Sequence, residues 1–197
     1  MKIKQFVTGA LPTNSYLVYD KGEAILIDCG GEEETILKFL KKHPIKLKYI
    51  LLTHGHFDHI EVHKILKETK AKLGIHKKDS LMLRHPANLS YNDMEPIHED
   101  FNIHGGDIFR ISNTELEVIE TPGHSPGGIC FYSEKSKILF SGDTLFKKAI
   151  GRTDLPLSNE KDMIKSLKRL MKLKDDIQVY PGHGDQTTIG KERPYFS

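Results

Sequence analysis

The stretch Thr53-His54-Gly55-His56-Phe57-Asp58-His59 carries the strongest signal in the chain. Three histidines and one aspartate fall within six residues, and all four are side chains that bind metals. Partners on one helix face lie three or four residues apart, so this tighter spacing favours a loop that turns its side chains toward one point. The apolar residues 49–52 before it are typical of a strand that is buried on both faces.

Further along the chain, three segments each place one more residue of this kind just after an expected strand. His124 lies in the Gly/Pro-rich loop 121–127, Asp143 follows an apolar strand, and His183 follows the last expected strand. Loops at strand ends hold a large share of catalytic groups. The full candidate set is therefore His54, His56, Asp58, His59, His124, Asp143 and His183.

This set of side chains suits divalent metal ions. Five imidazoles and two carboxylates favour zinc above all, with iron or manganese as alternatives. Seven ligands are too many for one tetrahedral ion, but they are enough for two ions if one carboxylate bridges them. Two ions at ~3.5–4 Å can share a hydroxide and clamp both the attacking and the leaving oxygen. Such a centre carries net positive charge, which predicts a hydrolase of small anionic substrates.

The remaining pattern predicts strands in two runs, each accompanied by helices. Strands of the first run are expected at residues 3–7, 15–19, 24–27, 49–52 and 72–75, with helices around residues 36–40 and 60–66. Strands of the second run are expected at residues 109–111, 115–119, 128–132, 137–140 and 177–180, with a helix at residues 159–173. Residues 77–105 have the least regular pattern. We expect one or two helical turns at residues 79–83, and a long loop over the rest that shapes the pocket. An α/β (α+β) fold of two packed sheets with outer helices follows.

Length and composition narrow the class of protein. The chain has 197 residues, so we expect one domain over residues 1–197. Its 29 basic and 27 acidic side chains give a net charge of +2, which argues against a nucleic-acid partner. Apolar runs are far shorter than the ~20 residues of a membrane span, and we see no secretory signal. We therefore expect a cytoplasmic protein with no membrane partner, in which Cys29 and Cys130 are reduced. No pattern predicts an oligomeric state.

The candidate set resembles the metallo-β-lactamase superfamily. The hallmark of that family is His-x-His-x-Asp-His, here residues 54–59, followed in order by a lone His, a lone Asp and a final His. The resemblance covers the chain from Asp28, in Ile27-Asp28-Cys29-Gly30, to His183. It implies a four-layer αββα sandwich with the metals at the edges of the sheets.

The resemblance also implies roles for individual residues. His54, His56 and His124 would hold one metal, Asp58, His59 and His183 would hold the other, and Asp143 would bridge them. Asp58 and Asp143 would also act in catalysis, by keeping the hydroxide in line with the substrate. We expect Asp28 to orient a ligand loop by accepting a hydrogen bond. Six other histidines are expected to lie on the surface or in loops: His43, His63, His76, His85, His98 and His104.

Within the superfamily, the chain is most similar to short bacterial forms of glyoxalase II, the hydroxyacylglutathione hydrolase. The likeness rests on Ser141-Gly142-Asp143-Thr144-Leu145-Phe146 and on Gly151-Arg152. It implies hydrolysis of S-lactoylglutathione or a related acyl thioester. β-Lactamases commonly carry Cys at the bridging place, so Asp143 argues against antibiotic hydrolysis.

The chain departs from full-length glyoxalase II in the part that grips glutathione. It stops 14 residues after His183, so we expect no C-terminal glutathione-binding helical lobe. Asp185 stands where that family has a tyrosine. Arg152 remains as a candidate to bind a substrate carboxylate, and an ion pair with Asp154 is the alternative.

Another reaction class remains open. Persulfide dioxygenases look similar around Gly151-Arg152-Thr153-Asp154, and that resemblance implies a single iron held by His54, His124 and Asp143. Such an enzyme would act on glutathione persulfide. Non-catalytic metal binding or nucleic-acid processing is a third possibility, which the lack of room for a second domain disfavours.

Overall fold

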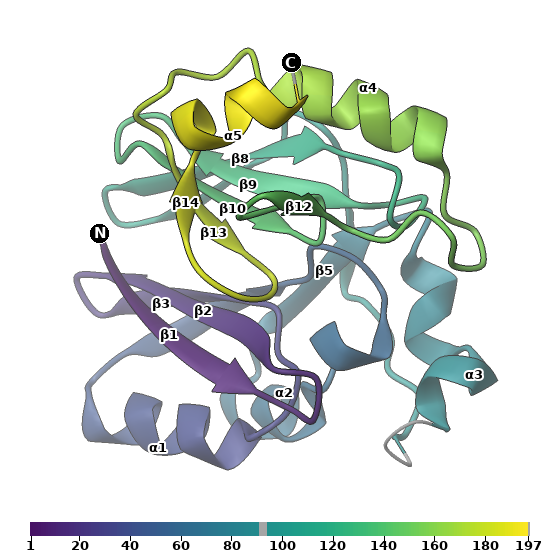
Figure 1. The fold of residues 1–197 in the computed structure, drawn as a ribbon. Helices are drawn as coiled ribbons and strands as arrows, with labels where there is room; N and C mark the ends of the chain where they lie inside the picture. Colours follow the sequence, from purple (N-terminus) through teal and green to yellow (C-terminus); the bar gives the residue numbers. More distant parts are fainter. Residues whose placement is uncertain (91–93, 197) are drawn as a thin grey trace.

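A computed structural model describes residues 1–90 and 94–196. Within these residues the chain forms two six-stranded sheets that pack face to face, with helices on the outer side of each sheet (Figure 1). The layers run helix, sheet, sheet, helix. The expected α/β fold, a four-layer αββα sandwich, is therefore confirmed.

The first sheet combines an antiparallel and a parallel half. Its strands stand in the order β1 (Lys2–Thr8), β2 (Thr13–Asp20), β3 (Glu23–Ile27), β4 (Lys46–Leu51), β5 (Lys72–His76) and β6 (Phe101–Ile103). β1, β2 and β3 pair antiparallel, whereas β3, β4, β5 and β6 pair parallel. Helices α1 (Glu33–Lys42) and α2 (His63–Thr69) cover the outer face (Figure 1). Because β3 and β4 are parallel neighbours, the loops after them leave the sheet at the same edge.

The second sheet is mostly antiparallel. Its strands stand in the order β14 (Thr187–Thr188), β13 (Gln178–Pro181), β10 (Ile138–Gly142), β9 (Ile129–Ser133), β8 (Thr114–Glu120) and β7 (Ile108–Ile111). Only the β10–β13 pair among these strands is parallel, so the residues after β10 and β13 also meet at one edge. Helices α4 (Glu160–Leu170) and α5 (Ile189–Phe196) lie on the outer face. β11 (Leu145–Phe146) and β12 (Ala149–Ile150) form a separate small hairpin.

Three apolar layers hold these elements together. Side chains alternate along a strand, so β3 sends Ala24 and Leu26 toward α1, and sends Ile25 and Ile27 toward the second sheet. Phe140 of β10 meets the latter pair in the layer between the sheets. The third layer lies between the second sheet and α4, where buried side chains follow a helical stripe: Met163, Leu167 and Leu170. Each sheet is thus covered on both faces, as buried strands require.

Residues 77–105 contain the expected helical turn and further structure besides. η2 (Ser80–Arg84) corresponds to the turn expected at residues 79–83, whereas α3 (Pro86–Leu89) and β6, at the edge of the first sheet, were not predicted. Residues 91–93 of this stretch lie outside the described residues. The sequence analysis also missed β11, β12, β14 and α5. Across the described ranges, none of the helices is long and apolar enough to span a membrane.

Candidate metal centre

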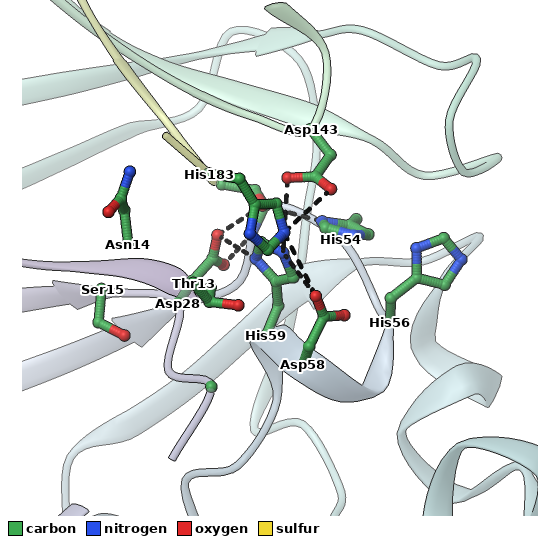
Figure 2. A network of polar contacts seen from close by, with 12 residues as sticks. Thr13, Asn14, Ser15, Asp28, His54, His56, Asp58, His59, Asp143 and His183 are labelled. Atoms are coloured by element: carbon green, nitrogen blue, oxygen red, sulfur yellow. Dashed lines mark hydrogen bonds and ion pairs between the residues drawn. The ribbon is translucent and has the colours of Figure 1, made fainter. Parts of the chain in front are cut away.

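The seven predicted ligands come together at one edge of the sandwich. All of them except His124 are labelled in Figure 2. His54 and His56 follow β4, and the short helical turn η1 (Phe57–His59) carries Asp58 and His59. Loops of the second sheet supply the remaining three: His124 between β8 and β9, Asp143 after β10, and His183 after β13. The site therefore forms only when the two sheets are packed together.

Three histidines, His54, His56 and His124, form a first group, which we call the His54 cluster. Their ligand atoms all lie within 4.8 Å of one another, and Nδ1 of His56 is 2.8 Å from Nε2 of His124. In two of these rings, the Nδ1 atom already has a hydrogen-bond partner. His54 Nδ1 lies 3.1 Å from the Thr53 hydroxyl, and His124 Nδ1 donates to the Arg152 carbonyl at 2.9 Å. These contacts leave the Nε2 atoms of His54 and His124 to face the centre.

Asp58, His59 and His183 form a second group, the His183 cluster. Nε2 of His183 lies 3.3 Å from Asp58 Oδ2 and 3.3 Å from His59 Nε2. Nδ1 of His183 donates to the Pro12 carbonyl at 2.9 Å, which fixes the ring with its Nε2 toward the cluster. The first sheet therefore helps to orient a ligand that the second sheet supplies.

Asp143 lies between the two clusters. Its Oδ1 is 3.5 Å from His59 Nε2, and its Oδ2 is 3.6 Å from His124 Nε2 and 3.5 Å from His183 Nε2. One carboxylate therefore faces both groups, which is the position of a bridging ligand.

The side chains present fit a divalent metal. Two ligand atoms at ~2.05 Å from a tetrahedral zinc ion are about 3.3–3.4 Å apart, and most separations among these residues fall between 3.3 and 3.7 Å. Within the described residues, His54 Nε2 and Asp143 Oδ1 are buried without a hydrogen-bond partner. A cavity of about 10 Å³, the size of one water-sized sphere, is lined by His54, His124 and Asp143. A cation would satisfy both orphaned atoms.

The site lowers the pKa of two histidines of the His54 cluster and raises the pKa of both histidines of the His183 cluster. Burial and the neighbouring His59 hold the pKa of His54 well below its usual range, and burial with His124 lowers the pKa of His56 to about 4. Both rings are therefore neutral at pH 7, as metal ligands must be. Burial also acts against a charge on His59 and His183, but facing carboxylates outweigh it. They raise the pKa of His59 to about 9 and that of His183 to about 11.

Asp58 and Asp143 are the counterparts of those two imidazolium groups. Burial opposes their ionisation, but His59 and His183 lower the pKa of both carboxyl groups. Without an ion, the His183 cluster is thus a set of hydrogen-bonded charge pairs. A cation would displace the protons on the two rings.

Asp28 supports both ligand segments of the first sheet. Its side chain is buried, and it accepts hydrogen bonds from the Thr53 amide and hydroxyl, each at 2.7 Å, and from His59 Nδ1 at 2.9 Å. The role expected for Asp28, to orient a ligand loop, stays a prediction, and these contacts are the ones it would need. They also select the His59 tautomer whose Nε2 is free to bind a cation.

Asn14 is a supporting residue that the sequence analysis missed. Its side-chain amide donates to the carbonyls of Pro181 at 3.0 Å and Gly184 at 2.9 Å, on either side of His183. Its backbone amide donates to the Gly182 carbonyl at 2.7 Å. The sequence marks Asn14 only as part of a turn, because its partners lie about 170 residues further along the chain. Asp79 is a second missed residue, which contacts both loops of the His54 cluster.

The structure also places Arg152 and His76, whose surroundings were expected from the sequence. The exposed guanidinium of Arg152 forms two hydrogen bonds of 2.9 Å with Asp154, which is the alternative noted above, and its role in substrate binding stays a prediction. His76 was expected on the surface or in a loop, and this was wrong. It ends β5, is buried, and lies 3.3 Å from Glu120, because β5 is an inner strand flanked by β4 and β6.

A four-layer sandwich with a cluster of histidines and aspartates at its edge defines a class of metal-binding proteins. A family model described as the metallo-beta-lactamase superfamily matches residues 8–183. The chain belongs to this superfamily, whose members are generally metal-dependent hydrolases.

Two curated relatives match nearly the whole chain. An uncharacterized protein of Aquifex aeolicus (strain VF5) is 39% identical over 203 residues, covering 99% of this chain and 95% of its own length. A protein of Haemophilus influenzae named hydroxyacylglutathione hydrolase GloC is 34% identical over 203 residues, covering 98% of this chain and 95% of its own length.

Solved structures show the same fold. BLEG-1, named a B3 metallo-beta-lactamase, superposes with a TM-score of 0.90 at 34% identity and covers 99% of this chain and 98% of its own. TTHA1623 in a di-iron-bound form gives 0.87 at 34% identity, with 98% of each chain covered. ETHE1 from Myxococcus xanthus gives 0.84 at 26% identity, with 100% of this chain and 84% of its own covered.

Proposed function

We propose that this chain is a hydrolase with two divalent metal ions that cleaves a small anionic thioester, in the manner of glyoxalase II. S-Lactoylglutathione or a related acyl thioester is the substrate class. The position of Asp143 carries the proposal, because its two carboxylate oxygens lie 3.5 Å from His59 and 3.6 Å from His124, one residue of each cluster. The likeness to the relative named hydroxyacylglutathione hydrolase GloC supports the substrate class.

Each cluster would hold one ion in this proposal. His54, His56 and His124 would hold the first, Asp58, His59 and His183 would hold the second, and Asp143 would contribute to both. Zinc suits this nitrogen and oxygen set best, and iron or manganese can take its place. The similar structure of TTHA1623 in a di-iron-bound form supports a centre for two ions.

Residues of the chain then perform the reaction as follows. Divalent ions held by these residues would supply a hydroxide nucleophile near neutral pH and would polarise the substrate carbonyl. Asp58 and Asp143 face each other across His183 Nε2, and their carboxylates orient the nucleophile toward the carbonyl carbon. The C–S bond breaks and the sulfur leaves as a thiolate. A thiol has a pKa of ~8.5, so this leaving group needs little protonation and no serine, cysteine or lysine nucleophile is required.

A mononuclear-iron persulfide dioxygenase is the second candidate. Asp143 Oδ2 lies 3.6 Å from His124 Nε2, and His54 Nε2 is buried without a hydrogen-bond partner, so these three residues can share one ion. That arrangement leaves His56 and the His183 cluster without a role, although His56 lies 2.8 Å from His124. We therefore favour the hydrolase.

The remaining properties are part of the same proposal. Residues 1–197 act as one domain on a small-molecule substrate, without a nucleic-acid or membrane partner. Cys29 and Cys130 are both free and buried, which supports a reducing compartment, the cytoplasm.

The test compares three substrates with the same purified protein. S-Lactoylglutathione should release free glutathione thiol, whereas glutathione persulfide should cause no oxygen uptake and a cephalosporin should stay intact. His54→Ala should lose more than nine-tenths of the thioesterase activity, and His98→Ala, which removes an exposed histidine outside both clusters, should keep it. Oxygen uptake on the persulfide without thioester cleavage would establish the dioxygenase instead. Cephalosporin cleavage alone would identify a β-lactamase.

A further inference from the structure

Asp79 lies between the two loops that carry the His54 cluster. It lies three residues after the end of β5, just before η2, and is fully buried, with no exposed side-chain surface. The loop after β4 supplies His54 and His56 on one side of it, and the loop between β8 and β9 supplies His124 on the other. The first of these loops belongs to the first sheet and the other to the second sheet. Strand pairing therefore does not set the distance between them.

The Asp79 carboxylate binds both loops at once. Its Oδ2 accepts a hydrogen bond from the Gly55 amide at 3.2 Å and from the Ser125 hydroxyl at 2.5 Å. Its Oδ1 accepts from the Gly127 amide at 2.6 Å. Gly55 lies between His54 and His56, and Ser125 follows His124. A single side chain thus fixes the backbone next to all three ligands of the cluster.

Two glycines allow this close approach. A Cβ atom at Gly127 would lie 2.7 Å from Asp79 Oδ1, and a Cβ atom at Gly55 would lie 2.7 Å from the side chain of Met82 and 3.0 Å from the Asp79 carbonyl oxygen. The glycine in the His-Gly-His stretch therefore makes room for residues 79–82. Asn88 also holds Gly55 in place, because its side-chain amide donates to the Gly55 carbonyl at 2.6 Å.

We propose that Asp79 is a positioning residue that holds the two loops of the His54 cluster at ligating separation and so sets the affinity of this cluster for its ion. The inference rests on the proposed two-ion centre. It assigns a role to Asp79, for which the sequence predicted only a helical turn in a stretch that shapes the pocket. Because Asp79 contacts backbone and hydroxyl groups beside the ligands, its loss should act on the His54 cluster and leave the His183 cluster intact.

Removing a group that orients metal ligands typically lowers metal affinity by about 10–100-fold. Asp79→Ala removes all three hydrogen bonds, and we expect a loss in this range for one of two ions. Asp79→Asn keeps one acceptor oxygen for the Gly127 amide but turns an NH₂ group toward the Gly55 amide. We therefore expect it to restore part of the affinity. Ser125→Ala removes one hydrogen bond only, and should give the smallest loss.

The experiment titrates the metal-depleted full-length protein with Co²⁺, and follows both the heat of binding and the visible absorption of the bound ion. His56→Ala and His183→Ala provide reference spectra for proteins that lack one ligand of each cluster. Asp79→Ala should show one weakened binding event, and its spectrum should match that of His56→Ala. A general loss of stability would not produce this match.

Glu192→Gln is the matched control. Glu192 is also a buried carboxylate that accepts one hydroxyl, from Thr187 at 2.5 Å, and one backbone amide, from Lys148 at 2.7 Å. It contacts no residue of the His54 cluster, so both binding events should stay as in the unmodified protein even if the melting temperature falls.

The outcomes separate the two proposals. If the unmodified protein binds two Co²⁺ ions and Asp79→Ala binds both with unchanged affinity, the role of Asp79 is wrong and the two-ion centre stands. Equal weakening of both ions, or a spectrum matching His183→Ala, would also overturn the role of Asp79. If the unmodified protein binds no Co²⁺, both proposals are wrong.

Discussion

Oδ2 of Asp28 lies 2.9 Å from Nδ1 of His59, although 31 residues separate them in the chain. Asp28 follows β3 with a left-handed backbone (φ 55°), and the parallel neighbour β4 leads into the loop that carries His59. A non-glycine residue in this region of backbone space costs of order 1–3 kcal/mol. The surrounding contacts hold it there, and its carboxylate reaches both Thr53 and His59 as a result.

Asp28→Asn should weaken the ion of the His183 cluster. An amide at this place can accept the hydrogen bond of the Thr53 amide through its oxygen. Its NH₂ group, in the place of Oδ2, can accept neither the Thr53 hydroxyl nor His59 Nδ1. The ring then loses the partner that fixes its tautomer, and we expect metal affinity to fall about 10–100-fold. Calorimetric titration with Zn²⁺ measures this. Asp100→Asn changes a carboxylate that binds Lys72 and the Leu73 amide away from the site, and should leave the affinity unchanged. Equal affinities in both variants would refute the role of Asp28.

Asn14→Ala should destabilise the protein by loosening the contact between the sheets. The variant leaves the Gly184 carbonyl without its side-chain donor, whereas the Pro181 carbonyl keeps the hydroxyl of Tyr16 at 2.8 Å. Gly184 is exposed and its carbonyl can bind water instead, so we expect the cost of a typical hydrogen bond, about 0.5–1.5 kcal/mol. Urea unfolding of the metal-free protein should show a loss of that size in the free energy of unfolding. Gln5→Ala, which removes one contact to the Asn14 side chain, should cost less. A larger effect for Gln5 would contradict this ranking.

Stability of the metal-free protein should fall as the pH rises above neutrality. Burial alone would lower the pKa of His59 and His183. Carboxylates, including Asp143 and Asp58, outweigh burial and raise the two pKa values to about 9 and about 11. Both lie above the 6.5 of the unfolded chain, so the folded protein binds more protons than the unfolded one. The linked stability is complete below pH 6.5 and is lost as the pH rises through 9 toward 11.

Bound metal should remove this dependence, because both rings are then deprotonated ligands. Metal binding at pH 7.5 should also release protons, which calorimetry in buffers of different ionisation enthalpy detects. Unfolding curves of the metal-free protein at pH 7 and pH 10 provide the comparison. Equal or greater stability at pH 10, or binding without proton release, would show that the two rings are neutral before the ion arrives.

Asp143→Asn should lower the number of bound ions from two to one. The substitution keeps the shape of the side chain but removes the charge and one acceptor between the clusters. Loss of a group that merely orients a ligand costs up to about 100-fold, so loss of a bridging ligand should lower thioester hydrolysis by at least ~100-fold. We expect one ion to be retained, as counted by elemental analysis. A variant with two ions and full activity would exclude the bridging role.

Much of the site could be predicted from sequence because the candidate ligands lie in loops that follow strands. Asp143 comes directly after β10, and His183 lies two residues after the end of β13. Asp28 could be placed for the same reason. Strand ends at one edge of a sandwich are near one another in space, so the residues there are brought together.

The residues that sequence analysis missed act over long separations. Asn14 binds residues 167 and 170 positions away, and Asp79 binds Ser125, 46 positions away, so no local pattern marks either one. Elements were missed for a related reason. β6, β11, β12 and β14 each have two or three residues, too few for an alternating pattern, and they exist because a neighbouring strand offers hydrogen bonds.

Elemental analysis of the purified full-length protein tests the central claim most directly. The account predicts close to two divalent ions per chain, falling to about one in the His183→Ala variant, which removes a ligand of one cluster only. A folded wild-type protein that carries no divalent ion, even after incubation with Zn²⁺, Fe²⁺ or Mn²⁺, would contradict it.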